Sequence, residues 1–345
     1  MKFEVTDSIH ELESEWSSLA RAAGNLFGTP EWVRAWQECF GNPNGLRLIS
    51  ARDDGGHLLG VVPLVVDRRG PLRIARFAGH GVGDILGPVV DPSVPGLARA
   101  VLSESLDRSV TDWDVFVGER MRESDGWGSD WGDTVVRAEA NPTVHLTDWP
   151  DWEAFVSSRS KKLRQEIRRD QRVLANQHGM IIHRVAAGDE LPPALDKLFR
   201  LHTLRFGEQS GFAPHVAFHR RFAALALDRG WLRLWTLEVE GRAVASRYDF
   251  SYGNAYYAYN AGRDPSWARG SVGLVLRAHT MEDAFREGVA DYRFLRGDEP
   301  YKKRFGTTDD RLVSIARARS WLGRRAISLG LRLSELPGAR RFVRL

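Results

Sequence analysis

A short polar run near residue 300 carries residue types that can move protons. The sequence RGDEPYKK begins at Arg296 and contains Asp298, Glu299, Tyr301 and Lys302. A carboxylate can take a proton from a substrate, and a phenol or an ammonium group can give one or stabilise an oxyanion. We therefore treat the two carboxylates as candidate bases and the tyrosine and the lysine as candidate donors. The alternative is a solvated loop in which an aspartate pairs with a lysine.

A second candidate site lies upstream, where Arg269, Gly270, Ser271 and Gly273 precede an amphipathic run that predicts a helix over 271–287. The first turn of a helix has free N–H groups and the positive end of the helix dipole, and glycines let an anion approach the backbone. These residues favour a phosphate site. The GxGxxG spacing of dinucleotide sites is absent. The alternative is an ordinary helix start whose glycines allow close packing.

Two further places could bind a charged substrate. Asp84 stands in the glycine-rich string GVGDILGP, where it could face a ligand or form an Asx turn. Arg164 and Arg168 are four residues apart in a strongly basic predicted helix over 160–177, so they share one face of it. Such a face could hold a phosphate group, although a charge run on a helix is usually solvated.

The sequence gives little support for a metal site or a disulfide. His215 and His219 have the i, i+4 spacing of two ligands, but no glutamate follows His215 and no third ligand is evident. Cys39 is the single cysteine, which excludes an internal disulfide and a zinc ribbon. We expect no metal.

The elements that must position these residues follow a repeated order. Each half of the chain is predicted as helix, helix, strand, strand, strand, helix, strand. This pattern indicates an internal duplication of one α/β unit. We predict an N-terminal domain over 1–147, a C-terminal domain with the cofactor site over 148–310, and a basic amphipathic segment over 311–345.

Charge is unevenly distributed along the 345 residues. The segment from Arg311 onward has nine arginines and one acid, so it carries +8 and the rest of the chain carries −4. The body therefore lacks the charge signature of a general nucleic-acid binder. The tail could lie on anionic lipid or pack on the acidic body. No apolar run is long enough to span a membrane, and the N-terminus has no signal-peptide pattern, so we expect a cytoplasmic protein.

Several strings add a resemblance to a known family. The element order resembles the GCN5-related N-acetyltransferase (GNAT) fold. The strings FGTPEWVRAW, RSKKLRQEIRRDQRVL, LHTLRF and GSVGLVLRAHTMEDAFREGVADYRFLRGDEPYKKRFG look like the CelD-like (BcsL-like) acyltransferases, which have a double GNAT fold and an acetyltransferase domain of the BioF2-like type. The resemblance runs from about Leu26 to Gly306, with Val272 in place of a frequent proline and Ile85 in place of a tyrosine. It implies two tandem GNAT-like domains, each a mixed sheet flanked by helices.

The resemblance also implies roles for individual residues. The helix start at 269–273 would face the diphosphate of acetyl-CoA or another acyl-CoA, and backbone N–H groups of Asn260, Ala261 and Gly262 would hold the oxyanion. Asp84 falls in a region that faces the acceptor in FemAB-type relatives, and Arg205 of LHTLRF recurs in the family, so both become acceptor-side candidates.

Three functions are consistent with these observations. The first is direct transfer of an acyl group, with acetyl favoured, from acyl-CoA to an amine or hydroxyl of a sugar or cell-envelope precursor, such as a sugar nucleotide or a lipid-linked exopolysaccharide intermediate. It needs no nucleic acid, and the tail would allow peripheral contact with the inner membrane. The second is transfer from aminoacyl-tRNA, as in the FemAB-type enzymes that share the doubled fold. The third is a non-catalytic scaffold of a polysaccharide-synthesis complex.

Overall fold

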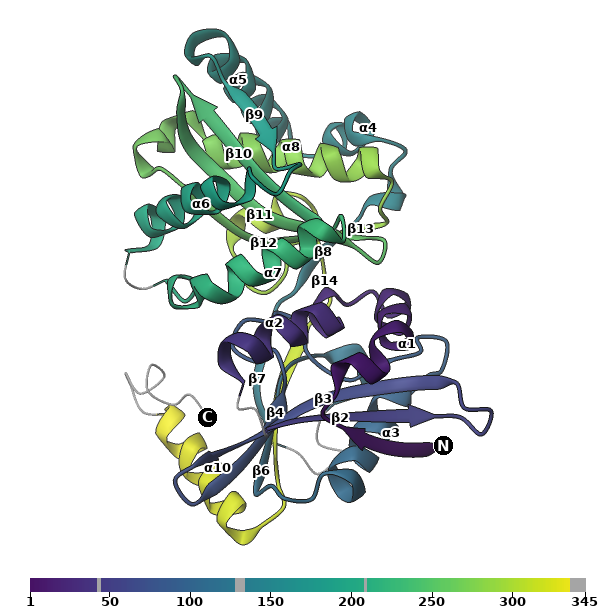
Figure 1. Cartoon of the computed structure of the whole chain (residues 1–345). Helices are drawn as coiled ribbons and strands as arrows, with labels where there is room; N and C mark the ends of the chain where they lie inside the picture. The colour runs from purple at the N-terminus through teal and green to yellow at the C-terminus, as the bar shows by residue number, and fades with distance from the viewer. Residues whose placement is uncertain (42–44, 128–133, 208–209, 336–345) are drawn as a thin grey trace. The chain divides into compact units, whose positions relative to one another are not determined.

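The chain forms two compact α/β units, and each has its own mixed sheet (Figure 1). This computed structural model describes residues 1–41, 45–127, 134–207 and 210–335; the side chains of 213, 268–270 and 331–335 are also outside the description. Unit 1 comprises Met1–Ala140 and Asp310–Leu345, and unit 2 comprises Asn141–Asp309. Unit 2 is thus inserted into the chain of unit 1.

The elements of unit 1 come from both ends of the chain. They are β1 (Lys2–Thr6), α1 (Ile9–Ala22), α2 (Pro30–Phe40), β2 (Leu46–Arg52), β3 (Leu58–Arg69), β4 (Leu72–Phe77), β5 (Val89–Val90), α3 (Leu97–Glu104), β6 (Val115–Arg122), β7 (Thr134–Glu139), β15 (Leu312–Ala318) and α10 (Trp321–Glu335).

Unit 2 is continuous in sequence. Its elements are β8 (Pro142–His145), α4 (Trp152–Ser157), α5 (Lys161–His178), β9 (Ile181–Arg184), α6 (Leu191–Phe206), α7 (Val216–Asp228), β10 (Leu232–Val239), β11 (Arg242–Tyr252), β12 (Ala255–Arg263), α8 (Val272–Glu287), β13 (Asp291–Arg293), α9 (Pro300–Lys303) and β14 (Thr308–Asp309).

The two sheets repeat one strand order. Sheet A runs β1-β2-β3-β4-β6-β15-β7, and sheet B runs β9-β10-β11-β12-β13-β8-β14. In both sheets the fourth and fifth strands are a parallel pair, and the helix that joins them is α3 in unit 1 and α8 in unit 2. The α/β class and the duplication expected from the sequence are therefore confirmed.

Local sequence sets several helix ends. The Thr29 hydroxyl accepts a hydrogen bond from the Trp32 N–H at 3.2 Å, and Pro30 occupies the first position of α2. Ser160 caps α5 in the same way, and Gly179 ends that helix in the left-handed conformation with φ 56°. These are the start and stop signals of the predicted helices.

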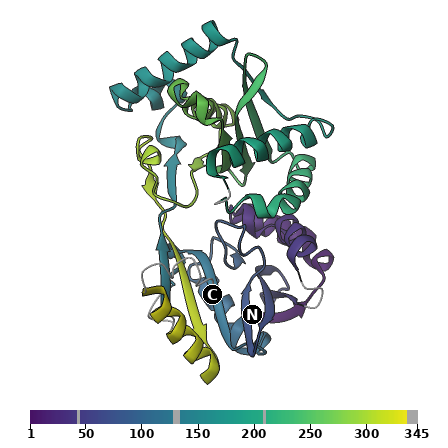
Figure 2. The same ribbon diagram turned by 90° about the vertical axis from the view of Figure 1, so that its left-hand side faces the viewer.

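The C-terminal segment differs from the expectation. Residues 311–345 do not form a separate segment, because β15 lies between β6 and β7 of sheet A and α10 lies along β15 (Figure 2). Leu312, Val313 and Ile315 are buried in this sheet. Conversely, β8 of the predicted first domain pairs with β13 in sheet B. The observed boundaries therefore fall at 140/141 and 309/310, since strand pairing at this distance in sequence leaves no local signal.

The middle of sheet B opens beside β12. Strands β12 and β13 pair in parallel only over Ala255–Tyr257 and Asp291–Arg293, and β12 continues to Arg263 without this neighbour. The pairing of β12 with β11 is also irregular. Tyr248 pairs with Asn260 and Phe250 with Tyr257, so β12 has one residue more than β11 between these two pairs. Such a bulge bends the strand. Helix α8 covers one face of this region, and α6 and α7 cover the other (Figure 1).

Gly262 allows α6 to pack closely on β12. A Cβ at this position would lie 2.4 Å from the His202 backbone nitrogen and 2.6 Å from the Leu201 carbonyl carbon. Because backbone atoms cannot give way, we expect Gly262→Ala to lower the free energy of unfolding of unit 2 by about 1–3 kcal/mol. Chemical denaturation of the full chain measures this change.

Gly188 offers a matched control for that substitution. It is exposed, and a Cβ there would meet nothing within 4 Å. Gly188→Ala should change the free energy of unfolding by less than about 0.5 kcal/mol. Equal stabilities of the two variants would contradict the packing role of Gly262.

Candidate functional site

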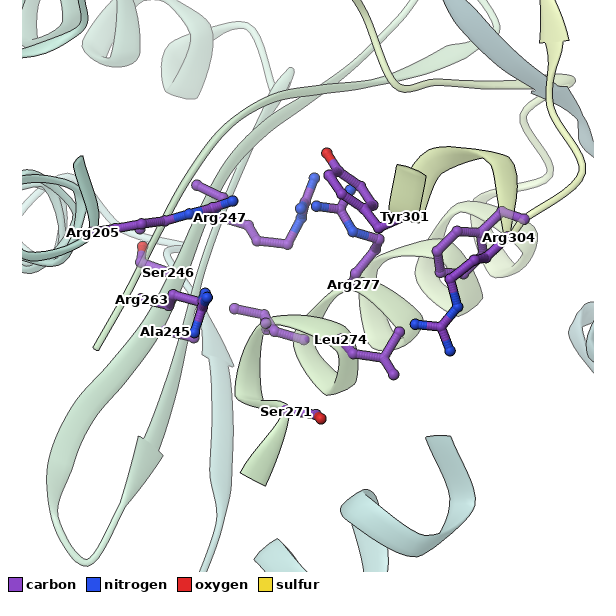
Figure 3. A pocket seen from close by; sticks show the side chains of 15 residues that line it. Arg205, Ala245, Ser246, Arg247, Arg263, Ser271, Leu274, Arg277, Tyr301 and Arg304 are labelled. Atoms are coloured by element: carbon purple, nitrogen blue, oxygen red, sulfur yellow. The ribbon is translucent and has the colours of Figure 1, made fainter. Parts of the chain in front are cut away.

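A cavity of about 260 Å³ lies in unit 2 where β12 and β13 diverge. Its most conspicuous lining residues are five arginines and a tyrosine from α6, β11, β12, α8 and the α9 region (Figure 3). They are Arg205, Arg247, Arg263, Arg277, Tyr301 and Arg304. This lining is strongly cationic, so the cavity is suited to an anionic ligand.

The start of α8 forms one end of the cavity. Ser271 occupies the N-cap position with the left-handed φ of 46° and makes no side-chain capping hydrogen bond, and Ser271 and Gly273 both line the cavity. A Cβ on Gly273 would lie 3.3 Å from Cδ of Arg263, so this arginine runs beside the helix start. Arg269 and Gly270 belong to the short 3-10 helix Pro265–Gly270 just before it, and their side chains are outside the described part of the structure.

The end of β12 forms the adjacent wall. Ala261 and Gly262 line the cavity. The Asn260 side-chain oxygen accepts a hydrogen bond from the Ala261 N–H at 2.8 Å. That N–H group, one of those expected to hold an oxyanion, is therefore already engaged. The Gly262 N–H faces β11 as well, because Gly262 lies opposite Ser246 in the same alternation as Asp264, whose N–H donates to the Val244 carbonyl oxygen.

A buried ion pair supports the centre of the cavity. The Arg247 guanidinium donates two hydrogen bonds to the Asp249 carboxylate, at 2.7 and 2.9 Å, and both side chains are buried. Burial opposes the charged form of Arg247, but the attraction of Asp249 outweighs it and raises the pKa of the guanidinium above its ordinary value. Arg247 also donates to the Tyr292 hydroxyl at 3.4 Å, and that hydroxyl lies 3.0 Å from Thr280 Oγ1 on α8.

Of the polar run near residue 300, the structure brings Tyr301 to the cavity. The Arg277 guanidinium lies over the Tyr301 ring at 4.3 Å from its centroid and 5.4 Å from that of Phe294. Asp298 and Glu299 are exposed and do not line the cavity. Burial alone would raise the pKa of the Glu299 carboxyl, but its hydrogen bond and ion pair with Lys302 at 2.9 Å hold it below the ordinary value. A carboxylate held in this way is a weak base.

Lys302 is placed as a structural residue. It is 2% exposed, and Nζ donates to the carbonyl oxygens of Leu295, Arg296 and Gly297 at 3.0, 2.6 and 3.1 Å. The ammonium group therefore fixes the turn after β13, where Leu295 has a φ of 58°. Its donors point to this turn, and Lys302 is not among the residues that line the cavity.

Lys302→Met tests this structural role. The substitution leaves three carbonyl oxygens without their charged donor, so we expect a loss of roughly 2–3 kcal/mol in the free energy of unfolding. Lys303→Met is the control, because Lys303 is the exposed neighbour. If thermal unfolding showed no difference between the two variants, the turn would not depend on Lys302.

The other predicted substrate-binding residues lie apart from the cavity, with one exception. Asp84 is buried in unit 1, 3.9 Å from Arg120 Nη1. Arg164 donates to the backbone oxygens of Ser157 and Arg159, and thus caps the end of α4. Arg168 pairs with Glu153 at 3.4 Å. Arg205 is the residue of this set that lines the cavity.

Four cavity arginines are not among the residues predicted from the sequence: Arg247, Arg263, Arg277 and Arg304. Two of them left a signal. Arg247 and Asp249 stand two apart within the apolar strand AVASRYDF, so their side chains share a buried face. Arg277 interrupts the apolar face of the helix between Leu274 and Met281. Nothing comparable marks Arg263 or Arg304, which stand in polar surroundings.

His202 lies behind the cavity and makes the fold sensitive to acid. It is 5% exposed, its Nδ1 lies 3.0 Å from Ser210 Oγ, and burial with the nearby charge of Arg205 lowers its pKa to about 4. Between pH 6.5 and about 4 the unfolded chain therefore binds a proton that the folded chain does not. The folded state loses stability as pH falls through this window, by roughly 3 kcal/mol for this residue.

The comparison of wild type with His202→Gln isolates this contribution. We expect the free energy of unfolding of wild type to fall by roughly 3 kcal/mol more than that of the variant between pH 7 and pH 4. Denaturant titrations at a series of pH values measure how the free energy of unfolding of each protein changes with pH. Parallel slopes would show that His202 takes a proton in the folded state.

Within the described residues, no group of three or more His, Cys, Asp or Glu side chains could hold a metal ion. None of the described helices combines the length and the apolar character that crossing a membrane requires.

Most of unit 2 is similar in sequence to a known family model. Residues 161–303 match the family model described as "Acetyltransferase (GNAT) domain". The matched range begins with α5 and ends with α9, so it contains the residues that line the cavity except Arg304 and Phe305. A search of curated proteins found no match to the chain.

Solved structures share the doubled architecture. FemX is similar with a TM-score of 0.68 and 12% identity, over 95% of this chain and 99% of that chain. L-PGS from Bacillus licheniformis gives a TM-score of 0.55 and 13% identity over 92% and 97% of the two chains. A tandem GNAT protein from the clavulanic acid biosynthesis pathway gives 0.53 and 13% over 92% and 99%. At these identities the likeness concerns the fold, and this chain has the fold of a tandem GNAT protein.

Proposed function

We propose that this chain transfers an acyl group, with acetyl favoured, from acyl-CoA to an amine or hydroxyl. The observation that carries the proposal is the cavity that joins the start of α8 to the diverging end of β12. The match of this region to a GNAT acetyltransferase domain supports a transferase.

The parts of acyl-CoA have distinct places in this proposal. Its diphosphate binds at the start of α8, where the N–H groups of the first turn, Gly273 and the Arg263 side chain favour negative charge. Its pantetheine arm lies along the part of β12 that β13 leaves unpaired, whose backbone groups can bond to the amides of the arm. The thioester then lies near Gly262.

The reaction is a direct displacement. The acceptor nitrogen or oxygen attacks the thioester carbon, the C–S bond breaks, and the thiolate of CoA leaves. A base takes the proton of the acceptor, and a donor protonates the thiolate. Tyr301 is the donor in this proposal because it lines the cavity. Asp298 is exposed outside the cavity and Glu299 is tied to Lys302, so neither carboxylate is assigned as the base.

The nature of the acceptor rests on the resemblance to the CelD-like acyltransferases. We extend the proposal to a sugar or cell-envelope precursor as acceptor, in the cytoplasm. Helix α10 adds a place for peripheral contact with an anionic membrane surface. Trp321 and Leu329 are 63% and 60% exposed on it, and Arg324 and Arg325 are exposed as well.

Transfer from aminoacyl-tRNA is the second candidate. The cationic cavity and the likeness in fold to FemX are compatible with it. The basic helix α5 gives it less support, because Arg164 and Arg168 are engaged with α4. A transfer assay with radiolabelled aminoacyl-tRNA separates it from the first candidate.

Calorimetry with acetyl-CoA tests the favoured function. We expect binding in the micromolar range by wild type and its loss in Gly273→Trp, because the indole would fill the cavity at the helix start. Gly188→Trp is the control, at an exposed glycine of the same unit with open space around it.

Two results would count against the proposal. Absence of binding to acetyl-CoA and to longer acyl-CoA by wild type would leave the tRNA-dependent and the scaffold functions. Equal binding by Gly273→Trp and Gly188→Trp would place the cofactor elsewhere in the chain.

A further inference from the structure

The cavity holds more positive charge than its own carboxylates balance. Arg247 pairs with Asp249, and Arg304 pairs with Glu166. For Arg205, Arg263 and Arg277, no carboxylate of the described residues lies within ion-pair distance. None of these three guanidinium groups donates a hydrogen bond to a described residue.

Arg277 is the most telling of these cations. It is only 9% exposed, it lies on α8 four residues after Gly273, and its neighbours are two aromatic rings and the guanidinium of Arg247. Burial lowers the pKa of the Arg277 guanidinium, and the charge of Arg247 lowers it further. A buried cation without an anionic partner destabilises a fold by several kcal/mol. An apolar residue would suit this helix face better unless a ligand provides the missing anion.

The unbalanced charge lies at two ends of the cavity. Arg263 runs beside the helix start with Ser271 and Gly273. Figure 3 shows Arg247, Arg277 and Tyr301 together at the other end, away from Ser271, with Arg205 directed toward them. A diphosphate at the helix start would therefore leave the second group of arginines without an anion.

We propose that Arg205, Arg247 and Arg277 form a second anion-binding subsite, which holds a carboxylate or phosphate of a substrate close to the reacting thioester. This inference rests on the proposed acyl transfer and specifies its substrate. Guanidinium groups bind both oxyanions in bidentate fashion. The anion can belong to the donor, as in an acyl-CoA whose acyl chain ends in a carboxylate, or to an anionic acceptor.

The subsite also has a consequence for specificity. A neutral acyl chain or acceptor leaves the buried charge of Arg277 unpaired, whereas an anionic one pairs with it. Discrimination that arises from an unpaired buried group is large, so we expect a preference of at least about tenfold.

Calorimetry on the full chain tests the subsite in two titrations. In the first, acetyl-CoA or succinyl-CoA is added to the free protein. In the second, succinate or inorganic phosphate is added to protein that is saturated with acetyl-CoA. The test variants are Arg277→Met and Arg205→Met. Arg205 is exposed, so its replacement by methionine should leave the fold intact. The matched control is Arg168→Met, an exposed arginine of unit 2 that pairs with Glu153. Thermal unfolding of each variant verifies the fold.

Two results support the inference and identify the source of the anion. If the acyl donor carries the anion, succinyl-CoA binds at least tenfold more tightly than acetyl-CoA. Both test variants then remove this difference in affinity, and their affinity for acetyl-CoA changes less than twofold. If the acceptor carries the anion, acetyl-CoA and succinyl-CoA bind with equal affinity. Phosphate or succinate then binds to the acetyl-CoA-saturated test variants at least tenfold more weakly than to the saturated wild type. Arg168→Met behaves as wild type in either case.

Other results overturn it. If both test variants reduce the affinity for acetyl-CoA as much as the affinity for every other ligand, the arginines bind the phosphates of CoA itself. If no anion binds and Arg277→Met only changes stability, Arg277 is a structural residue. Binding of phosphate or succinate to free protein that depends on Arg277, without binding of either thioester, would refute acyl-CoA as donor and leave the subsite standing.

Discussion

The ion pair between Arg247 and Asp249 is the interaction on which the site in unit 2 depends. It lies inside the sheet on β11, and through the Tyr292 hydroxyl it reaches β13 and then Thr280 on α8. Of these elements, β11 and α8 line the cavity. Removing one partner of a buried pair leaves an uncompensated charge, which typically destabilises a protein by about 3–5 kcal/mol. The pair therefore fixes the mutual positions of strand and helix while Arg247 presents one cationic edge to the cavity.

The divergence of β12 and β13 is the second constraint on the site, and only part of this arrangement can be predicted from the sequence. The helix predicted over 271–287 is found over Val272–Glu287. These limits are local, since glycines and apolar periodicity mark them. The bulge on β12 and the short pairing with β13 are properties of strand register, which depends on neighbours far away in the sequence.

The site residues show the same division between local and non-local information. Ser271, Gly273, Tyr301 and Arg205 could be found from the sequence, because a helix start and family strings mark them. Of the other cavity arginines, Arg247 and Arg277 are marked by the apolar elements around them, whereas Arg263 and Arg304 could not be ranked among the 49 lysines and arginines of the chain. Lys302 illustrates the converse: a lysine in a polar run suggests chemistry, and only the carbonyl oxygens around Nζ reveal a structural residue.

The exchange of β8 and β15 between the halves of the chain bears on biosynthesis. Every strand of sheet B lies within 142–309, so this sheet can be completed as soon as that stretch has left the ribosome. Sheet A must wait for β15, which lies between β6 and β7 and is translated some 170 residues after β7. Until then β6 and β7 have unpaired edges, which are prone to aggregation. The half of the protein that is begun first is thus finished last, and a chaperone that shields strand edges would act on the N-terminal half of the nascent chain.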